Sequence, residues 1–395
     1  MPGARDARRM KPVAARMGRV RESGTVKITD AVNKLRREGR EVISFSVGEP
    51  DFPTPAPVVE AAQRALAEGH TKYVSAWGLP ALREAIAEKC NKENGISAKV
   101  ADVLVTPAKQ AVMYAILTLV DEGDEVVLPD PAWVSYAPLV ALAGGRVVRA
   151  PATLETDYRL TPEALAEAVT PRTKLVIVNS PSNPTGGVAT PDDVRGWSDL
   201  IKDHDLWLLS DELYEKVLYE GQHVSPASLP GMWERTLTVN GFSKAYAMTG
   251  WRVGWLAGPE GAMREAIKLQ QHSLTHPAPF SQMGALEALR MDQAPVRDMV
   301  AEFRARRDII VEGLRSIPGW TVNVPKGAFY VFARFDHALD SMQMAERLLH
   351  DAGVALTPGI EFGPRGEKHV RISYANSREN LRKGLARMAE ACAKL

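Results

Sequence analysis

Short apolar runs alternate with segments of helical periodicity along most of this 395-residue chain. The clearest runs are rich in Val, Leu and Ile, which is typical of parallel strands covered on both faces by helices. They lie at residues 103–105, 125–128, 175–178, 206–209, 236–239 and 253–256. This alternation predicts an α/β fold with a mostly parallel central sheet flanked by helices.

The pattern changes after about residue 295. A long charged helix (297–314) is followed by an apolar segment at 327–332, another helix and a final strand near 370–372. This change predicts a smaller α+β domain onto which the N-terminal segment folds back. We expect a large domain at residues 56–295 and a small one at residues 21–55 plus 296–395, as the length allows. The basic residues 1–20 are expected to form a mobile arm.

The composition excludes several classes of partner. Lys and Arg number 49 against 48 Asp and Glu, so no overall field attracts nucleic acid or an anionic membrane. No apolar stretch is long enough to cross a bilayer, and no secretory core follows the start. The two cysteines, Cys90 and Cys392, form no close pair, and His272 and His276 lack a third metal ligand. We therefore expect a cytoplasmic protein without a metal, whose partners are small molecules and copies of itself.

Residues 241–252 carry chemistry that a purely structural segment does not need. Lys244 follows a predicted strand, borders small polar residues and precedes Arg252 by eight positions. It is therefore placed to act as an amine nucleophile beside a bound anion. This indicates a Schiff base with a phosphorylated aldehyde cofactor.

Another candidate anion site follows the strand at 103–105, because ligands of open α/β sheets bind where strands end and helices begin. Thr106 is suited to the N-cap of the next helix and Pro107 to its first turn. The free backbone amides of Ala108 and Lys109 can bind an anion there. The Lys109 side chain opposes the helix dipole unless it has an anionic partner, so we expect it to face the ligand.

Two later strand ends also carry polar residues. Asn183 lies in a turn rich in Pro, Asn and Gly and can donate its amide N–H to an oxyanion or a phenolate. Asp211 ends a buried strand, where an unpaired carboxylate would cost several kcal/mol. It therefore needs a cationic or N–H partner, and a pyridinium nitrogen would serve. Tyr214 follows three residues later.

Five residues in a fixed order carry a family resemblance: Asn183, Asp211, Tyr214, Lys244 and Arg252. Together they resemble the class I aminotransferases of the aspartate aminotransferase-like, fold type I pyridoxal-phosphate family. The resemblance covers nearly the whole chain, from residues 47–52 to residues 371–375. It implies pyridoxal 5'-phosphate as the cofactor and the fold type I architecture.

The resemblance also implies roles for single residues. Lys244 would hold the cofactor covalently and move a proton between the substrate Cα and the cofactor. Asp211 would keep the pyridine nitrogen protonated. Asn183 and Tyr214 would hydrogen-bond the phenolic oxygen of the ring. Trp133 would stack on the ring face.

The phosphate group would be bound by residues of two subunits. Arg252, Ser243 and the amides of Ala108 and Lys109 would contribute from one subunit, and Tyr73 from its neighbour. The resemblance therefore implies a homodimer with shared active sites. This chain departs from the common pattern twice, because Gly241 stands where many members carry serine and Ala108 where glycine is usual.

The substrate α-carboxylate would be held by Arg371, whose planar fork a lysine cannot replace. The backbone of Gly48 would lie beside it, and Trp133 and Asn183 would border the same substrate.

The distal group of the substrate is less well defined. In an aspartate-using branch that this chain resembles, a lysine at the position of Lys109 and hydroxyls of the N-terminal segment, here Ser23 and Thr25, bind the distal carboxylate. We expect aspartate or glutamate with 2-oxoglutarate or oxaloacetate. Aromatic amino acids, prephenate and arginine stay alternatives, because few residues decide among them.

Two other enzyme classes and a regulatory protein are the alternatives to this reaction. A pyridoxal-phosphate-dependent C–S β-lyase of the same fold would share every cofactor contact but release ammonia or a thiol. A nicotinamide dehydrogenase is disfavoured because no G-x-G-x-x-G follows the first strand. A regulator would need a DNA-binding module, for which there is no room before Val42.

Overall fold

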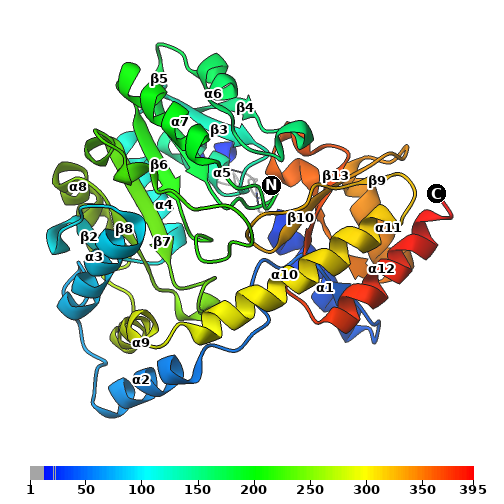
Figure 1. Cartoon of the computed structure of the whole chain (residues 1–395), viewed down its shortest axis with the longest axis horizontal. Helices are drawn as coiled ribbons and strands as arrows, with labels where there is room; N and C mark the ends of the chain where they lie inside the picture. The colour runs from blue at the N-terminus through cyan, green and yellow to red at the C-terminus, as the bar shows by residue number, and fades with distance from the viewer. Residues whose placement is uncertain (1–12, 21, 23) are drawn as a thin grey trace, which may run out of the picture.

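The computed structural model describes residues 13–20, 22 and 24–395. Its largest sheet has seven strands in the order β2-β8-β7-β6-β5-β3-β4 (Figure 1). Neighbouring strands are parallel except that β8 is antiparallel to both β2 and β7. The strands are β2 (Val103–Val105), β3 (Glu125–Asp130), β4 (Arg146–Pro151), β5 (Thr173–Asn179), β6 (Trp207–Asp211), β7 (Thr236–Gly241) and β8 (Gly254–Ala257). The predicted α/β fold with a mostly parallel sheet is confirmed.

Helices cover both faces of this sheet because successive strand side chains point to opposite faces. On β3, Leu128 belongs to the apolar cluster that includes residues of α4, α5 and α8, whereas Val127 belongs to the cluster that includes residues of α6 and α7. Helices α3 and α9 cover the β2–β8 edge, and α2 lies on α9. Their bounds are α2 (Ala56–Ala67), α3 (Pro80–Asn94), α4 (Ala108–Leu119), α5 (Tyr136–Ala143), α6 (Pro162–Ala168), α7 (Pro191–Asp203), α8 (Glu260–Gln271) and α9 (Pro279–Arg290).

The apolar pattern does not predict β4. This strand pairs only with β3 at the edge of the sheet, and Arg146 and Arg149 interrupt its apolar residues. Most of its side chains are half-buried rather than buried. An edge strand needs no continuous apolar run, so its sequence resembles that of a loop.

A smaller α+β region is formed by the N- and C-terminal segments, as predicted. Its antiparallel sheet has the order β12-β13-β10-β9, and β1 pairs in parallel with β11. Helix α10 runs from the side of α9 to α12 (Figure 1). The elements are α1 (Gly24–Arg37), β1 (Ile43–Ser44), α10 (Ala294–Arg315), β9 (Trp320–Thr321), β10 (Tyr330–Phe335), α11 (Ser341–Ala352), β11 (Val354–Ala355), β12 (Thr357–Pro358), β13 (His369–Ser373) and α12 (Arg378–Cys392). The exact domain limits stay a prediction.

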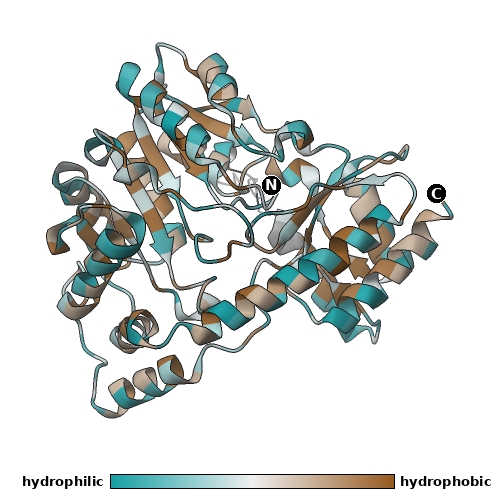
Figure 2. Ribbon diagram, viewed as in Figure 1, coloured by the Kyte–Doolittle hydropathy of each residue, from teal (hydrophilic) through white to brown (hydrophobic). Residues whose placement is uncertain are grey.

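Figure 2 shows apolar strands enclosed by helices whose outer faces are polar. Within the described residues, no helix combines the length and the apolar character that a membrane span requires. Part of the predicted arm forms a 3-10 helix, η1 (Ala15–Arg19), beside α5. Its Arg19 Nη2 lies 3.1 Å from Glu122 Oε1, an exposed pair that contributes little to stability. The mobility of the arm stays a prediction.

The carboxyl ends of three parallel strands meet at one edge of the large sheet. Strand β5 ends at Asn179, which is in register with Asp211 at the end of β6, and β7 ends beside them at Gly241. The small sheet faces this edge and brings Tyr330 on β10 and Arg371 on β13 to the same place. This junction positions the candidate site.

Candidate active site

A cavity of about 440 Å³ lies between the carboxyl edge of the large sheet and the small sheet. This volume suits a small-molecule ligand. Most of the predicted site residues line it: Gly48, Ala108, Lys109, Trp133, Asn183, Asp211, Tyr214, Ser243, Lys244, Arg252 and Arg371.

Three predicted site residues are not placed in this cavity. Tyr73 lies outside it, 88% exposed, with its ring edge on His276. Ser23 falls outside the described residues, and Thr25 lies in α1 with a side chain that is not described. Thr29 on the same helix does line the cavity, although no pattern in the sequence singled it out.

Lys244 lies in the turn after β7, and its Nζ donates a hydrogen bond to the carbonyl oxygen of Gly48 at 2.6 Å. Burial lowers the pKa of the Lys244 amine to about 8. A neutral amine is the nucleophilic form, so this position favours reaction with an electrophile near neutral pH.

Asp211 is buried at the end of β6. Its Oδ2 accepts a hydrogen bond from the hydroxyl of Tyr136 at 2.7 Å, and its Oδ1 accepts one from the N–H of Leu213 at 3.2 Å. Burial raises the pKa of the carboxyl to about 6, despite these two donors. A nearby cation would restore its charge. Tyr136 was missed by the sequence reasoning, although it lies in the same segment as Trp133.

Arg371 is 3% exposed, and its guanidinium donates hydrogen bonds to three uncharged residues. Its Nη1 donates to Asn183 Oδ1 at 3.0 Å, and its Nη2 donates to the carbonyl oxygen of Ser46 at 2.6 Å and to Thr357 Oγ1 at 3.3 Å. Its Nε is buried without a hydrogen-bond partner. No Asp or Glu of the described residues lies within ion-pair distance of it. A buried guanidinium without a counter-charge is costly, so this position favours an anionic ligand.

The loop after β5 is tied to β6 through two asparagines. The backbone N–H of Asn183 donates to Asn179 Oδ1 at 2.8 Å, and Asn179 Nδ2 donates to the carbonyl oxygen of Asp211 at 2.8 Å. The side-chain oxygen of Asn183 is occupied by Arg371. Its NH₂ group is therefore the part that can donate to a ligand.

A second cationic group lies at the start of α4. Burial lowers the pKa of the Lys109 ammonium, and the charge of Arg252 adds to this effect. Lys109 Nζ also lies 5.2 Å from the ring centre of Trp133. Neither Lys109 nor Arg252 has a carboxylate within ion-pair distance in the described part of the chain. Two neighbouring cations beside a helix N-terminus favour an anion such as phosphate.

The predicted N-cap of α4 is wrong by one residue. The helix begins at Ala108 after Pro107, which has no side chain that can cap it. The hydroxyl of Thr106 is buried without a hydrogen-bond partner. The first amides of α4 are therefore free of side-chain capping and available to a ligand.

The glycine at position 241 has a steric cause. Gly241 on β7 pairs with Gly254 on β8, and a Cβ on Gly241 would lie 2.9 Å from the Cα of Gly254. A Cβ on Gly254 would lie 3.1 Å from the backbone nitrogen of Ala108. A serine at position 241 would thus crowd the backbone of β8 at Gly254.

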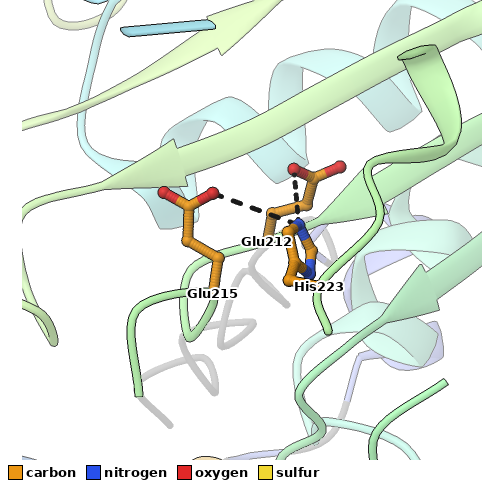
Figure 3. A group of neighbouring side chains, drawn as sticks. All are labelled: Glu212, Glu215 and His223. Carbon is orange, nitrogen blue, oxygen red and sulfur yellow. Dashed lines mark hydrogen bonds and ion pairs between the residues drawn. The ribbon is translucent and has the colours of Figure 1, made fainter. Parts of the chain in front are cut away.

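Glu212, Glu215 and His223 form a buried ionic cluster next to Asp211 (Figure 3). His223 Nε2 lies 3.1 Å from Glu212 Oε2 and 4.0 Å from Glu215 Oε2. Glu212 also accepts hydrogen bonds from Ser210 and Ser225, and Glu215 accepts them from Lys89 and Asn94. The ammonium of Lys89 repels a metal cation, so we interpret the cluster as a charge-balanced network.

We expect Glu215→Ala to lower the free energy of unfolding by about 3 kcal/mol, since it removes the buried carboxylate beside Lys89 and leaves only Asn94 and the more exposed Glu93 as its partners. Burial would raise the pKa of Glu215, but Lys89 and His223 outweigh it and hold the pKa at about 2. Urea denaturation measures the loss. The control is the exposed pair of Glu88 and Lys92, where Glu88→Ala should change little. Equal effects of the two variants would contradict the network.

Comparison with known proteins gives concordant results. The profile of a family described as aminotransferase class I and II matches residues 40–388. The chain is 44% identical over 385 residues to the aspartate/prephenate aminotransferase of Thermus thermophilus, covering 96% of this chain and 98% of that protein. It is 43% identical over 353 residues to the aromatic-amino-acid aminotransferase 2 of Thermococcus litoralis, covering 88% and 90%. The solved structure of the aspartate aminotransferase from Thermus thermophilus with maleate has a TM-score of 0.91 at 43% identity, covering 97% and 100%.

Proposed function

This chain belongs to the class I and II aminotransferases, and we propose that it transfers the amino group of L-aspartate or L-glutamate to a 2-oxo acid, 2-oxoglutarate or oxaloacetate. The family and the fold type I architecture inferred from the sequence are confirmed. One observation carries the choice of donor. Arg371 and Lys109 both line the cavity, and neither has an acidic partner among the described residues, which matches a substrate with two carboxylates.

The family uses pyridoxal 5'-phosphate, and the cavity residues fit this cofactor. Arg252 provides a cation for a phosphate, and the uncapped first turn of α4 provides the free amides of Ala108 and Lys109. The buried carboxyl of Asp211 provides the negative charge that a protonated pyridine nitrogen needs. Lys244 provides an amine with a lowered pKa in the same cavity.

The bound cofactor supplies an electron sink for the bond that breaks at the substrate Cα. In this proposal Lys244 takes the proton from the substrate Cα and delivers it to the cofactor. This role suits an amine with a pKa of about 8. Tyr214 and the NH₂ group of Asn183 donate hydrogen bonds to the phenolic oxygen of the ring. Trp133 covers one ring face, and Ser243 adds a hydroxyl at the phosphate.

Arg371 holds the substrate α-carboxylate in this proposal, and the backbone of Gly48 lies beside it. The hydrogen bonds of its guanidinium to Ser46 and Asn183 fix its orientation before a substrate binds. A fixed guanidinium needs no reordering when the carboxylate arrives, which favours both affinity and a single substrate orientation.

We also propose that the protein is a homodimer in the cytoplasm. The position of Tyr73 supports a dimer, because its ring is exposed and lies outside the cavity of its own subunit, whereas the family resemblance assigns it to the phosphate. In such a dimer Tyr73 would reach the phosphate in the site of the neighbouring subunit. Ser23 and Thr25 stay predicted contacts of the distal carboxylate.

The test of the aspartate assignment is Lys109→Met. We expect kcat/KM for L-aspartate to fall about 10- to 100-fold, because a charged hydrogen bond to the distal carboxylate is lost. The value for L-phenylalanine should change much less, since it has no distal carboxylate. The measurement is the rate at which each amino acid bleaches the visible band of the bound cofactor without an acceptor.

The matched control is Lys92→Met, which removes an exposed lysine from α3. It should leave both rates unchanged. Equal losses for aspartate and phenylalanine in Lys109→Met would reject the distal-carboxylate role and leave Lys109 as a phosphate contact.

Aromatic amino acids are the second candidate donors. Val112, Val134 and Leu213 form an apolar part of the cavity lining, beside Trp133. An apolar wall can accept an aromatic side chain in place of a carboxylate. Faster bleaching by phenylalanine than by aspartate in the unmodified protein would favour this candidate.

A further inference from the structure

Tyr330 on β10 is fully buried, yet it lines the cavity, and the sequence analysis assigned it no role. Its hydroxyl lies 2.8 Å from the hydroxyl of Tyr214. The guanidinium carbon of Arg371 lies 4.7 Å from the centre of its ring. One side chain thus touches both the residue proposed to bind the cofactor ring and the residue proposed to hold the substrate.

A third contact fixes where the hydroxyl of Tyr330 lies. A Cβ on Gly48 would be 2.5 Å from this hydroxyl oxygen, so only a glycine leaves room for it. The carbonyl oxygen of the same Gly48 accepts the hydrogen bond from Lys244. The tyrosine hydroxyl is therefore packed against the backbone that faces the reactive amine.

Two hydroxyls at hydrogen-bond distance share one proton, and the other proton is free to point elsewhere. Among the interactions of the described residues, neither Tyr214 nor Tyr330 has another side-chain hydrogen bond. If Tyr214 donated to Tyr330, its oxygen could only accept from a ligand. If Tyr330 donates to Tyr214, the proton of Tyr214 is available to a ligand in the cavity.

Arg371 lies over the ring of Tyr330, 4.7 Å from its centre, and no such contact with the ring of Tyr214 occurs among the described residues, which favours one of these two orientations. A cation beside a phenol makes it more acidic, and a more acidic hydroxyl is the better donor. Burial raises the pKa of Tyr330, and Arg371 offsets part of this rise. Burial and the neighbouring Tyr330 raise the pKa of Tyr214 well above its ordinary value, and Arg371 opposes this rise only in part. The closer contact of Arg371 with Tyr330 therefore favours Tyr330 as the donor of the pair.

We propose that Tyr330 is a positioning residue that donates its proton to Tyr214, so that the hydroxyl proton of Tyr214 points into the cavity, while its ring supports the guanidinium of Arg371. The inference rests on the proposed function, because it assigns Tyr214 an acceptor on the cofactor. It connects cofactor tuning and substrate binding through one side chain. Donation from Tyr330 also strengthens the donor capacity of Tyr214.

The test is a pH titration of the visible band of the bound cofactor in Tyr330→Phe, Tyr214→Phe and the double variant. A hydrogen bond from Tyr214 stabilises the deprotonated form of the phenolic oxygen, so a weaker bond raises the midpoint of the titration. We expect Tyr330→Phe to raise it by about half a unit to one unit. Tyr214→Phe should raise it at least as much, and the double variant should match Tyr214→Phe.

The outcomes separate this inference from the proposed function. A normal midpoint in Tyr330→Phe, or additive shifts in the double variant, would overturn the inference while Tyr214→Phe still showed its shift. No visible band in the unmodified protein would overturn both. The matched control is Tyr374→Phe, which removes the hydroxyl of a buried tyrosine that lies 3.2 Å from the carbonyl oxygen of Ala328 and 3.3 Å from the hydroxyl of Tyr219, outside the cavity. It should leave the midpoint unchanged.

The ring contact with Arg371 has its own test. Phenylalanine keeps the aromatic ring, so Tyr330→Phe should leave KM for the amino acid within about twofold, whereas Tyr330→Leu should raise it about 3- to 30-fold. Thermal unfolding shows whether the leucine variant folds. If the leucine variant does not fold, the KM of Tyr330→Phe decides. A rise in this KM beyond about twofold would contradict a separate role for the ring, because phenylalanine keeps the ring.

Discussion

Lys244→Ala is expected to lower kcat/KM for transamination by at least about 10⁴-fold, because it removes both the nucleophile and the proton carrier of the proposed reaction. The visible band of covalently bound cofactor should disappear. Steady-state kinetics and an absorption spectrum measure the two effects. Loss of the band with retained activity would reject the proton-transfer role.

This variant should not lose stability. Burial lowers the pKa of the Lys244 amine, which means that the folded protein disfavours its charged form. Removing the side chain therefore removes a desolvation cost along with the hydrogen bond to Gly48. Thermal unfolding of the cofactor-free proteins checks this, and a marked fall in the midpoint would indicate a structural role instead. Lys268→Ala, at an exposed lysine on α8, is the matched control.

The same pKa predicts how the cofactor-free protein captures the cofactor. The amine is mostly protonated below pH 8 and neutral above it, and only the neutral form attacks an aldehyde. The rate of capture should rise about tenfold for each pH unit below 8 and level off above it. Stopped-flow absorbance measures this rate, and a constant rate between pH 6 and pH 9 would contradict the lowered pKa.

Residues at the ends of predicted strands could be assigned from the sequence. Asn183, Asp211 and Lys244 follow apolar runs that became β5, β6 and β7, and parallel strands bring their carboxyl ends to one edge. The amide, carboxyl and amine groups of these three residues then define the part of the site that the large sheet contributes. Only local pattern and a general rule of sheet topology are needed for this step.

Residues that reach the site by packing could not be assigned in the same way. Tyr330 and Thr357 come from the small sheet, and Tyr136 reaches Asp211 from the start of α5. Their positions depend on how two sheets and a helix pack, and no spacing in the sequence encodes this. Arg371 was assigned only through the family resemblance, since an arginine in a strand is not unusual by itself.

Arg371→Met is expected to lower kcat/KM for amino acids by about 30- to 5000-fold, which corresponds to about 2–5 kcal/mol for one partner of a buried charged hydrogen-bond pair. The loss should appear mainly in KM, because the α-carboxylate is held both before and during the chemical step. The visible band of the cofactor should remain, since Lys244 and the cationic groups at the start of α4 are untouched. Arg334→Met, at an exposed arginine on β10, is the matched control and should change neither value.

A lysine at position 371 separates charge from geometry. Arg371→Lys keeps the positive charge but replaces the fork whose Nη1 and Nη2 are held by Asn183 and Ser46. If the α-carboxylate is bound by two parallel hydrogen bonds, lysine should recover only a small part of the lost kcat/KM. An amine that lacks the α-carboxylate gives the decisive comparison, because its slow reaction should be the same in the unmodified protein and in both variants. Equal losses for this amine and for aspartate would mean that Arg371 acts on the cavity as a whole and not on the carboxylate.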